Sequence, residues 1–315
     1  MEASWLFDDE NVQRGRFAAP KKKEKKSKLF PVLSLAFIVG IIASGMFLGV
    51  RLEYQKIDPD PPTSAEKARQ DMAVATSRII SYSHNNGHSD VATHAEQWLA
   101  VLGGVWQPWP DGNLPEGRTN PPYETEPPAN ADTAYLVEQL NDLSSSAANQ
   151  ASSYTAGERE ALVRIAIDAK ICAARVAVEA GMDAPVSGAL DAQQLAQFAN
   201  SDTLTTLSEA RQWLEKDASL AYATGRTSLS ARIETISAVE EAILANGTED
   251  KRPAVATFPQ LSGGQSLTSL ALSRIANQLI SDCTQATSPE QLRTLVTYVY
   301  SLYLTDSERA QADIL

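Results

Sequence analysis

The residues best suited to bind a ligand lie in one short polar segment, SHNNGHSDVATH, at positions 83–94. It contains all three histidines of the chain, His84, His88 and His94, with Asp90 among them. Imidazole nitrogens and carboxylate oxygens are zinc ligands, and a turn between two helices can gather them. The spacing matches no standard zinc motif. Two hypotheses therefore stand: a metal site formed by the three histidines, or a polar interhelical loop with some pH sensitivity, in which His94 simply packs on its helix.

The two cysteines, Cys172 and Cys283, offer a second kind of chemistry. Each falls on the apolar face of an expected helix, so two buried thiols are one interpretation. The other interpretation is a disulfide, which is permitted outside the cytoplasm. That bond would close a loop of roughly 110 residues and stabilise the fold by about 4–5 kcal/mol in the chain-entropy model.

The familiar catalytic signatures are missing from the sequence. No GxSxG, HExxH, P-loop or Rossmann glycine fingerprint occurs, and no histidine follows His94 to serve a downstream nucleophile. A di-iron bundle site needs Glu-x-x-His pairs, but the residues three before the histidines are Ser81, Asn85 and Val91. Glu240 and Glu241 are adjacent in an expected helix, so their side chains should point in different directions. We expect them on a solvated face of that helix. We therefore expect no enzyme and no cofactor, with a hydrolase using carboxylates paired by folding as the alternative.

A long apolar run determines where the rest of the chain lies. Residues 29–50 read LFPVLSLAFIVGIIASGMFLGV, without a charge, between Lys28 and Arg51. At about 1.5 Å rise per residue, such a helix spans the roughly 30 Å hydrocarbon core of a bilayer. The lysine-rich segment KKKEKKSK at 21–28 precedes it, and this places the N-terminus in the cytoplasm. We expect an uncleaved single-pass signal anchor in the cell membrane; the alternative is a signal peptide cleaved near residues 43–45.

Small residues recur within this run at the spacing of a helix–helix contact. Ala36, Gly40 and Ser44 follow one another at i+4, and Gly45 with Gly49 forms a GxxxG. Such faces let two membrane helices approach closely, so they favour packing against a second copy or another membrane protein. The alternative is the ordinary abundance of glycine and alanine in membrane helices.

Charge differs between the two sides of the expected membrane. Residues 1–28 hold eight basic and five acidic side chains, and the whole chain carries −12, so the remainder carries −15. An acidic exterior argues against nucleic acid and against docking by charge on anionic lipid. The predicted organisation is a cytoplasmic basic tail at 1–28, a transmembrane helix at 29–50, a Pro-rich linker at 51–63 and an extracytoplasmic helical domain at 64–315.

Beyond the linker the hydrophobic pattern is helical, and no run alternates with the period of a strand. Capping boxes mark two helix starts, Thr63 with Glu66 and Ser288 with Gln291. We expect an all-α fold of antiparallel helices packed as one or two bundles. The expected helices are 63–82, 89–102, 131–152, 156–180, 190–199, 202–223, 228–245, 266–285 and a last one from 288.

The helix expected at 156–180 has the strongest pattern. Its apolar stripe runs through Cys172, and an i+4 ladder of Glu160, Arg164 and Asp168 should lie on the other side, toward solvent.

A Pro-rich segment interrupts the helices at 107–130, where seven prolines exclude a helix or a central strand. Trp106, Trp109 and Tyr123 interleave with these prolines. Loops of this length are functional or disordered. Either the segment presents its aromatics to a partner, or the aromatics staple it onto the neighbouring helices.

Three segments carry a family resemblance: WLEKDASLAYATG at 213–225, RPAVATFP at 252–259 and LALSRIANQLISD at 270–282. With their order of helix, helix, Pro-containing loop, helix and helix, residues 205–305 resemble the ferritin-like helical domain of unknown function in actinobacterial envelope proteins. The resemblance covers about a third of the chain and implies a four-helix bundle. It implies no activity, since the sequence lacks the metal ligands of true ferritins.

These features together predict a non-enzymatic, membrane-anchored cell-envelope protein. Its helical domain would scaffold or bind another membrane or envelope protein. The alternatives are a metal- or small-ligand-binding sensor using His84, His88 and His94, and an envelope hydrolase.

Overall fold

A computed structural model describes residues 61–109, 117–185, 190–261 and 265–303. By compactness the chain divides into residues 1–59 and 60–315, and the described residues all belong to the second unit. The predicted tail, the 29–50 span and its small residues from Ala36 to Gly49 therefore lie outside the described residues. Within these residues, no helix is both long enough and apolar enough to cross a membrane.

Every regular element among the described residues is a helix, which confirms the all-α prediction. Two short 3-10 turns, η1 (Ala151–Ser153) and η2 (Cys283–Gln285), follow the helices labelled α4 and α9. The α-helices are α2 (Ser64–Asn86), α3 (Ser89–Leu102), α4 (Thr133–Gln150), α5 (Ala156–Glu179), α6 (Ala192–Ala196), α7 (Ser201–Leu220), α8 (Ala223–Ala245), α9 (Leu267–Asp282) and α10 (Pro289–Leu302).

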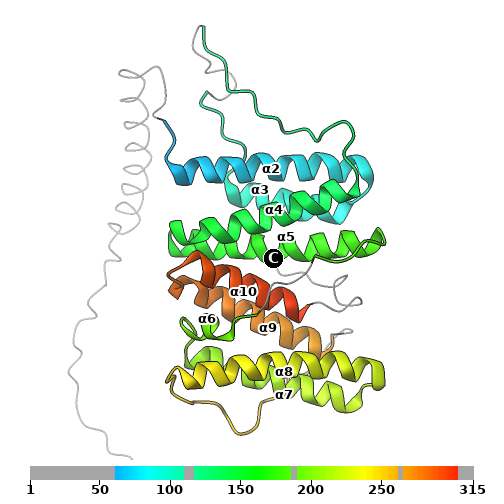
Figure 1. Cartoon of the computed structure of the whole chain (residues 1–315), viewed down its shortest axis with the longest axis vertical. Helices are drawn as coiled ribbons and strands as arrows, with labels where there is room; N and C mark the ends of the chain where they lie inside the picture. The colour runs from blue at the N-terminus through cyan, green and yellow to red at the C-terminus, as the bar shows by residue number, and fades with distance from the viewer. Residues whose placement is uncertain (1–60, 110–116, 186–189, 262–264, 304–315) are drawn as a thin grey trace, which may run out of the picture. The chain divides into compact units, whose positions relative to one another are not determined.

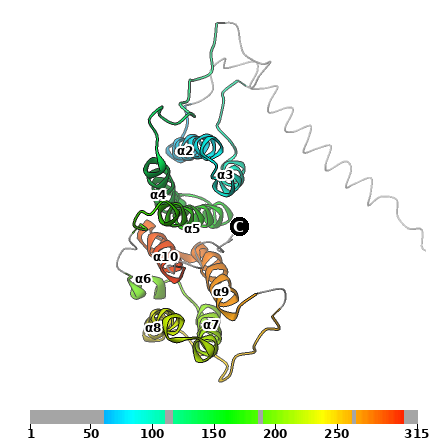
Figure 2. The same cartoon turned by 90° about the vertical axis from the view of Figure 1, so that its right-hand side faces the viewer.

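The helices pack as successive pairs. α2 lies against α3, α4 against α5, α9 beside α10, and α7 against α8, and both views show this order (Figures 1 and 2). α10 joins the two halves of the bundle, because it contacts α4 and α5 on one side and α6 and α9 on the other. The short α6 packs on α8. One hydrophobic core runs through all of these layers.

The starts of α2 and α10 and the end of α3 lie at the capping residues that the sequence predicts. At α2 the N–H of Glu66 donates to Thr63 Oγ1 at 3.2 Å, and the N–H of Thr63 donates to Glu66 Oε2 at 2.7 Å. Ser288 and Gln291 form the same reciprocal pair at α10. α3 ends at Gly103, whose φ of +84° is left-handed and favours glycine.

The start of α8 differs from the prediction. α8 begins at Ala223, five residues before the expected 228. Its apolar pattern begins only at Leu229, the first buried residue of the helix, and this delayed the predicted start. The turn before it is closed by Arg226, whose Nε and Nη2 donate to the carbonyls of Ala218 and Ala221, both at 3.2 Å. A side chain that satisfies the last carbonyls of α7 lets the next helix begin immediately.

α5 is the central helix of the core. It contacts α3, α4, α9 and α10, and most residues between Leu162 and Ala177 are buried. Part of the predicted charge ladder is present, since Arg164 donates to Glu160 at 3.1 Å. Asp168, however, is completely buried, so its predicted position toward solvent is wrong. The cause is α3, which covers that side of α5.

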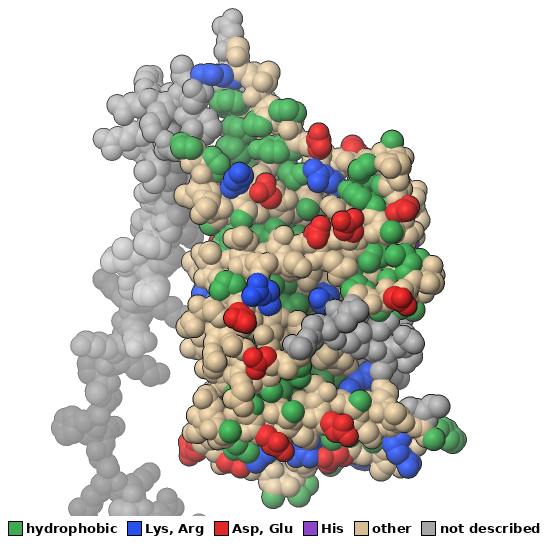
Figure 3. Space-filling view, in the orientation of Figure 1, with side chains coloured by type: hydrophobic (Ala, Val, Ile, Leu, Met, Phe, Trp, Pro, Cys, Tyr) green, Lys and Arg blue, Asp and Glu red, His purple; other side chains and the backbone are tan. Residues whose placement is uncertain are grey.

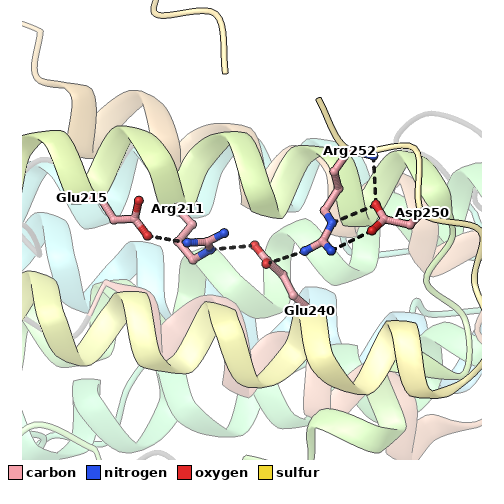
Figure 4. Close-up of polar contacts among 5 residues, drawn as sticks. All are labelled: Arg211, Glu215, Glu240, Asp250 and Arg252. Carbon is pink, nitrogen blue, oxygen red and sulfur yellow. Dashed lines mark hydrogen bonds and ion pairs between the residues drawn. The ribbon is translucent and has the colours of Figure 1, made fainter. Parts of the chain in front are cut away.

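An ion-pair network ties α7, α8 and the loop after α8 (Figure 4). Arg211 on α7 donates through Nε to Glu240 Oε1 at 3.2 Å and also pairs with Glu215. Arg252 donates to Glu240 Oε2 at 3.1 Å and to Asp250 at 2.8 Å. Glu240 is buried, so the prediction of a solvated face is wrong for this residue, although its neighbouring glutamate is exposed.

The described parts of the Pro-rich segment form neither helix nor strand, as predicted. Polar side chains hold it in place. Arg78 on α2 donates through Nε to the carbonyl of Glu124 at 2.6 Å. Asn120 bonds both backbone groups of Trp109, at 3.0 Å and 2.7 Å. These bonds, rather than the aromatic rings alone, fasten the segment to itself and to α2.

Candidate functional site

A buried carboxylate on α5 gathers the ligand-type side chains of the N-terminal half. Asp168 lies one helical turn before Cys172. From α3, Nδ1 of His94 lies 2.8 Å from Oδ2 of Asp168, and Nε1–H of Trp98 donates to the same oxygen at 2.8 Å. His94, Asp168 and Cys172 each place a potential ligand atom within 4.8 Å of the others. No other group of three is this close in the described part of the chain. We call these three residues the α3–α5 cluster.

The two oxygens of Asp168 have different surroundings. Oδ2 contacts His94 and Trp98, whereas Oδ1 is buried without a hydrogen-bond partner among the described residues. A buried, ionised carboxylate is unstable unless its oxygens are paired with donors or a cation. Oδ1 therefore has lone pairs available for a ligand inside the protein.

A guanidinium lies beside the thiol of the cluster. Nη2 of Arg175 lies 3.8 Å from Sγ of Cys172 and pairs with Oδ2 of Asp90 at 2.5 Å. The charge of Arg175 is itself balanced by Asp90, so the pair supports the cluster without adding net charge.

The structure does not bring the three histidines together. Nε2 of His84 pairs with Oε1 of Glu96 at 2.9 Å, and both side chains are exposed. His88 precedes α3 and stacks on Tyr82, with 6.3 Å between the ring centroids. Only His94 faces the cluster. His84 and His88 therefore fit the interpretation of a polar interhelical loop. His94 differs, because its ring contacts the carboxylate of Asp168.

Cys172 and Cys283 are two buried thiols in the structure, which is the first of the two interpretations, and no disulfide joins them. Arg159, near the start of α5, donates to the carbonyl of Thr284 at 2.9 Å, which places Cys283 beside that end of the helix. Cys172 lies thirteen residues further along α5, roughly 20 Å at the rise of an α-helix. A disulfide needs Cα atoms within about 7 Å. Burial raises the pKa of the Cys283 thiol to about 12.

The sequence did carry a signal for Asp168. It stands in IAIDAKICAARVAVEA, at 165–180, a stretch apolar on nearly every side. A helix that is apolar all round is a buried helix, and a carboxylate inside it needs a partner. The partners themselves lie on α3, 70 and 74 positions away along the chain.

A groove opens at the start of α2, and its volume is about 650 Å³, within the range of ligand sites. The first turns of α2, the end of α3 and two aromatics of the Pro-rich segment line it. Representative lining residues are Glu66, Gln70, Leu102, Gly104, Trp106 and Tyr123. Hydrophobic side chains gather at the α2 end of the helical unit in the space-filling view (Figure 3). We call the groove at the start of α2 the Trp106 groove.

The groove combines an aromatic surface with an available hydrogen-bond donor. Trp106 is 45% exposed. Its backbone N–H donates to Oε1 of Gln70 at 2.8 Å. Nε2 of Gln70 is buried and has no hydrogen-bond partner among the described residues. Arg69 is held by Glu158 at 2.5 Å and lies over the Tyr154 ring. The wall of the groove formed by Arg69 is thus held in place, and the amide nitrogen of Gln70 is an unused donor.

Comparison with protein-family models, curated proteins and solved structures finds no match to this chain. Residues 201–303 form, in order, α7, α8, a Pro-containing loop, α9 and α10. The ferritin-like resemblance itself stays a prediction.

Proposed function

We propose that this protein is a non-enzymatic, single-pass membrane protein of the cell envelope. In this proposal the extracytoplasmic helical domain binds a segment of another membrane or envelope protein in the Trp106 groove. The observation that carries the proposal is the groove, in which a half-exposed Trp106 lies beside Gln70, whose Nε2 has no hydrogen-bond partner among the described residues. Exposed aromatic side chains beside unused polar groups are typical of recognition sites.

The place of the groove along the chain indicates where the partner should be. Pro62 lines the groove, and only residues 51–61 separate it from the end of the expected span. Even fully extended as polyproline II, at about 3.1 Å per residue, this linker reaches roughly 35 Å. A partner in the groove would therefore present a segment close to the extracytoplasmic surface of the membrane that the expected span crosses.

An extended peptide is the occupant that the groove chemistry fits. After the buried Gln70 amide turns toward the groove, a backbone carbonyl of the peptide would accept a hydrogen bond from its Nε2, and a proline or other apolar side chain would pack on Trp106. The charges at the groove are mixed, with Lys67 and Arg69 beside Glu66 and Asp71, so recognition does not depend on net charge.

Affinity purification of the full chain from its native membranes, after mild detergent extraction, tests the proposal. We expect Trp106→Ala to lose a partner that the wild-type chain retains. Tyr222→Ala is the matched control, because Tyr222 is 91% exposed and precedes α8, away from the groove. Retention of the partner by Trp106→Ala contradicts the assignment to the groove. A lone monodisperse monomer under all mild conditions contradicts the partner-binding function itself.

A ligand-binding sensor is the second candidate function, and a different observation favours it. The α3–α5 cluster takes the place of the three histidines that the sequence suggested for this role.

A further inference from the structure

We propose that His94, Asp168 and Cys172 bind one zinc ion between α3 and α5. The proposal stands on two independent observations. The three side chains place potential ligand atoms within 4.8 Å of one another, and Oδ1 of the fully buried Asp168 has no hydrogen-bond partner in the part of the chain that the structure describes. It is independent of partner binding in the Trp106 groove.

The ligand atoms of the cluster favour zinc over other metals. One imidazole nitrogen, one carboxylate oxygen and one thiolate sulfur suit zinc, which binds all three types at about 2.0–2.3 Å. Magnesium and calcium prefer oxygen ligands alone, so the Cys172 thiolate disfavours them. Three protein ligands leave the fourth tetrahedral position for a water molecule or a small ligand. The His94 side chain is 15% exposed, so the cluster is accessible to solvent on that side.

The charges around the cluster also favour a divalent cation. An ionised Asp168 and a Cys172 thiolate would place two negative charges in the core. The guanidinium of Arg175, 3.8 Å from Cys172 Sγ, already pairs with Asp90. A zinc ion would neutralise the remaining two charges and give Asp168 Oδ1 the partner that it lacks.

Trp98 is a positioning residue for the cluster. Its buried indole N–H holds Oδ2 of Asp168 at 2.8 Å, and this bond orients the carboxylate. Hydrogen bonds to metal ligands fix their orientation, and losing one weakens metal binding by about 10–100-fold. Trp98→Phe should therefore weaken zinc binding within this range while every ligand atom remains present.

The competing explanation is a polar bridge without a metal. In that case Asp168 would be a protonated carboxyl or the partner of a charged His94, and the contacts with His94 and Trp98 would only join α3 to α5. Such a bridge predicts no stoichiometric metal and no spectroscopic signal from a metal–sulfur bond.

Cobalt(II) titration of the full chain in detergent, after treatment with a chelator, separates the two explanations. We expect one cobalt per chain and a near-ultraviolet thiolate-to-cobalt charge-transfer band. Cys172→Ser should abolish the band, and Cys283→Ser, the matched buried thiol, should keep it. His94→Asn and Asp168→Asn should weaken binding at least about 10-fold. His84→Asn and His88→Asn should leave binding unchanged. Circular dichroism confirms that each variant is folded.

Zinc X-ray absorption of the wild-type chain gives a test that does not depend on any variant. The expected first shell has one sulfur at about 2.3 Å and nitrogen or oxygen ligands at about 2.0–2.1 Å. Zinc without a sulfur ligand, or no stoichiometric metal, overturns the proposal. So does a band that persists in folded Cys172→Ser, or metal that is lost when His84 or His88 is replaced.

Discussion

Two neighbouring tyrosines of α10 use their hydroxyl groups in opposite ways. The hydroxyl of Tyr298 is buried without a hydrogen-bond partner among the described residues, and burial raises its pKa. The hydroxyl of Tyr300 donates to the carbonyl of Pro185 at 2.6 Å. Removing an unsatisfied group should stabilise the fold, so we expect Tyr298→Phe to raise the free energy of unfolding by about 1 kcal/mol. Tyr300→Phe should lower it by about 1 kcal/mol. Urea unfolding measures both, and a loss of stability in Tyr298→Phe would contradict the prediction.

Glu240 should make stability depend on pH in the opposite sense to an ordinary ion-paired carboxylate. Burial raises its pKa above the usual 4.5, and Arg211 and Arg252 only partly oppose this. The folded state therefore holds the proton more tightly than the unfolded state. Its contribution to stability is complete below the unfolded pKa and is lost as pH rises through the folded pKa. The free energy of unfolding of the wild type minus that of Glu240→Gln should fall as the pH rises from the unfolded pKa through the raised folded pKa. A difference that grows over this range would show that the arginines dominate.

At the residue scale, sequence predicts side-chain types better than side-chain partners. Glu240 meets Arg211 across 29 positions, and Asp168 meets His94 across 74. Such pairs depend on which helices become neighbours, and helical periodicity does not encode this. Asp168 and Glu240 were therefore predicted on solvated faces, although both are buried.

Helix caps give the clearest prediction at the scale of the element. The hydroxyl of Ser288 accepts from the N–H of Gln291 at 3.2 Å at the start of α10. Ser288→Ala removes this bond and should lower the free energy of unfolding by about 1 kcal/mol. Ser288→Asp should restore most of the loss, because aspartate also accepts at this position. Thermal unfolding of the three chains measures the effect. Equal stability of Ser288→Ala and wild type would show that the cap contributes nothing.

Elements were predictable where their signals are local. Capping boxes located the starts of α2 and α10, and an apolar stripe followed by glycines located α3, because each signal spans only a few residues. The end of α2 at Asn86 lies four residues beyond the expected 82. The start of α8 was placed late, because the bonds of Arg226 to the end of α7 leave no periodic pattern. The central position of α5 depends on four neighbouring helices and was not visible from its own stripe alone.

For the whole molecule, the proposed anchor predicts an effect confined to assembly. Gly40→Leu combined with Gly45→Leu should leave membrane insertion intact, since the span becomes more apolar. It should weaken any assembly within the membrane, because the two larger side chains keep neighbouring helices apart. Val39→Leu is the matched control, because at 100° per residue Val39 lies on a different face of the expected helix from Gly40 and Gly45. Sedimentation in mild detergent measures assembly, and unchanged assembly would make the span a tether only.

The most direct test of partner binding is photo-cross-linking in intact membranes. A photoreactive phenylalanine derivative replaces Trp106 in the full chain, and Tyr222 in a separate control chain. We predict one discrete cross-linked product from position 106, containing an extracytoplasmic segment of another membrane or envelope protein, and none from position 222. No product from position 106, or the same product from both positions, would contradict the account.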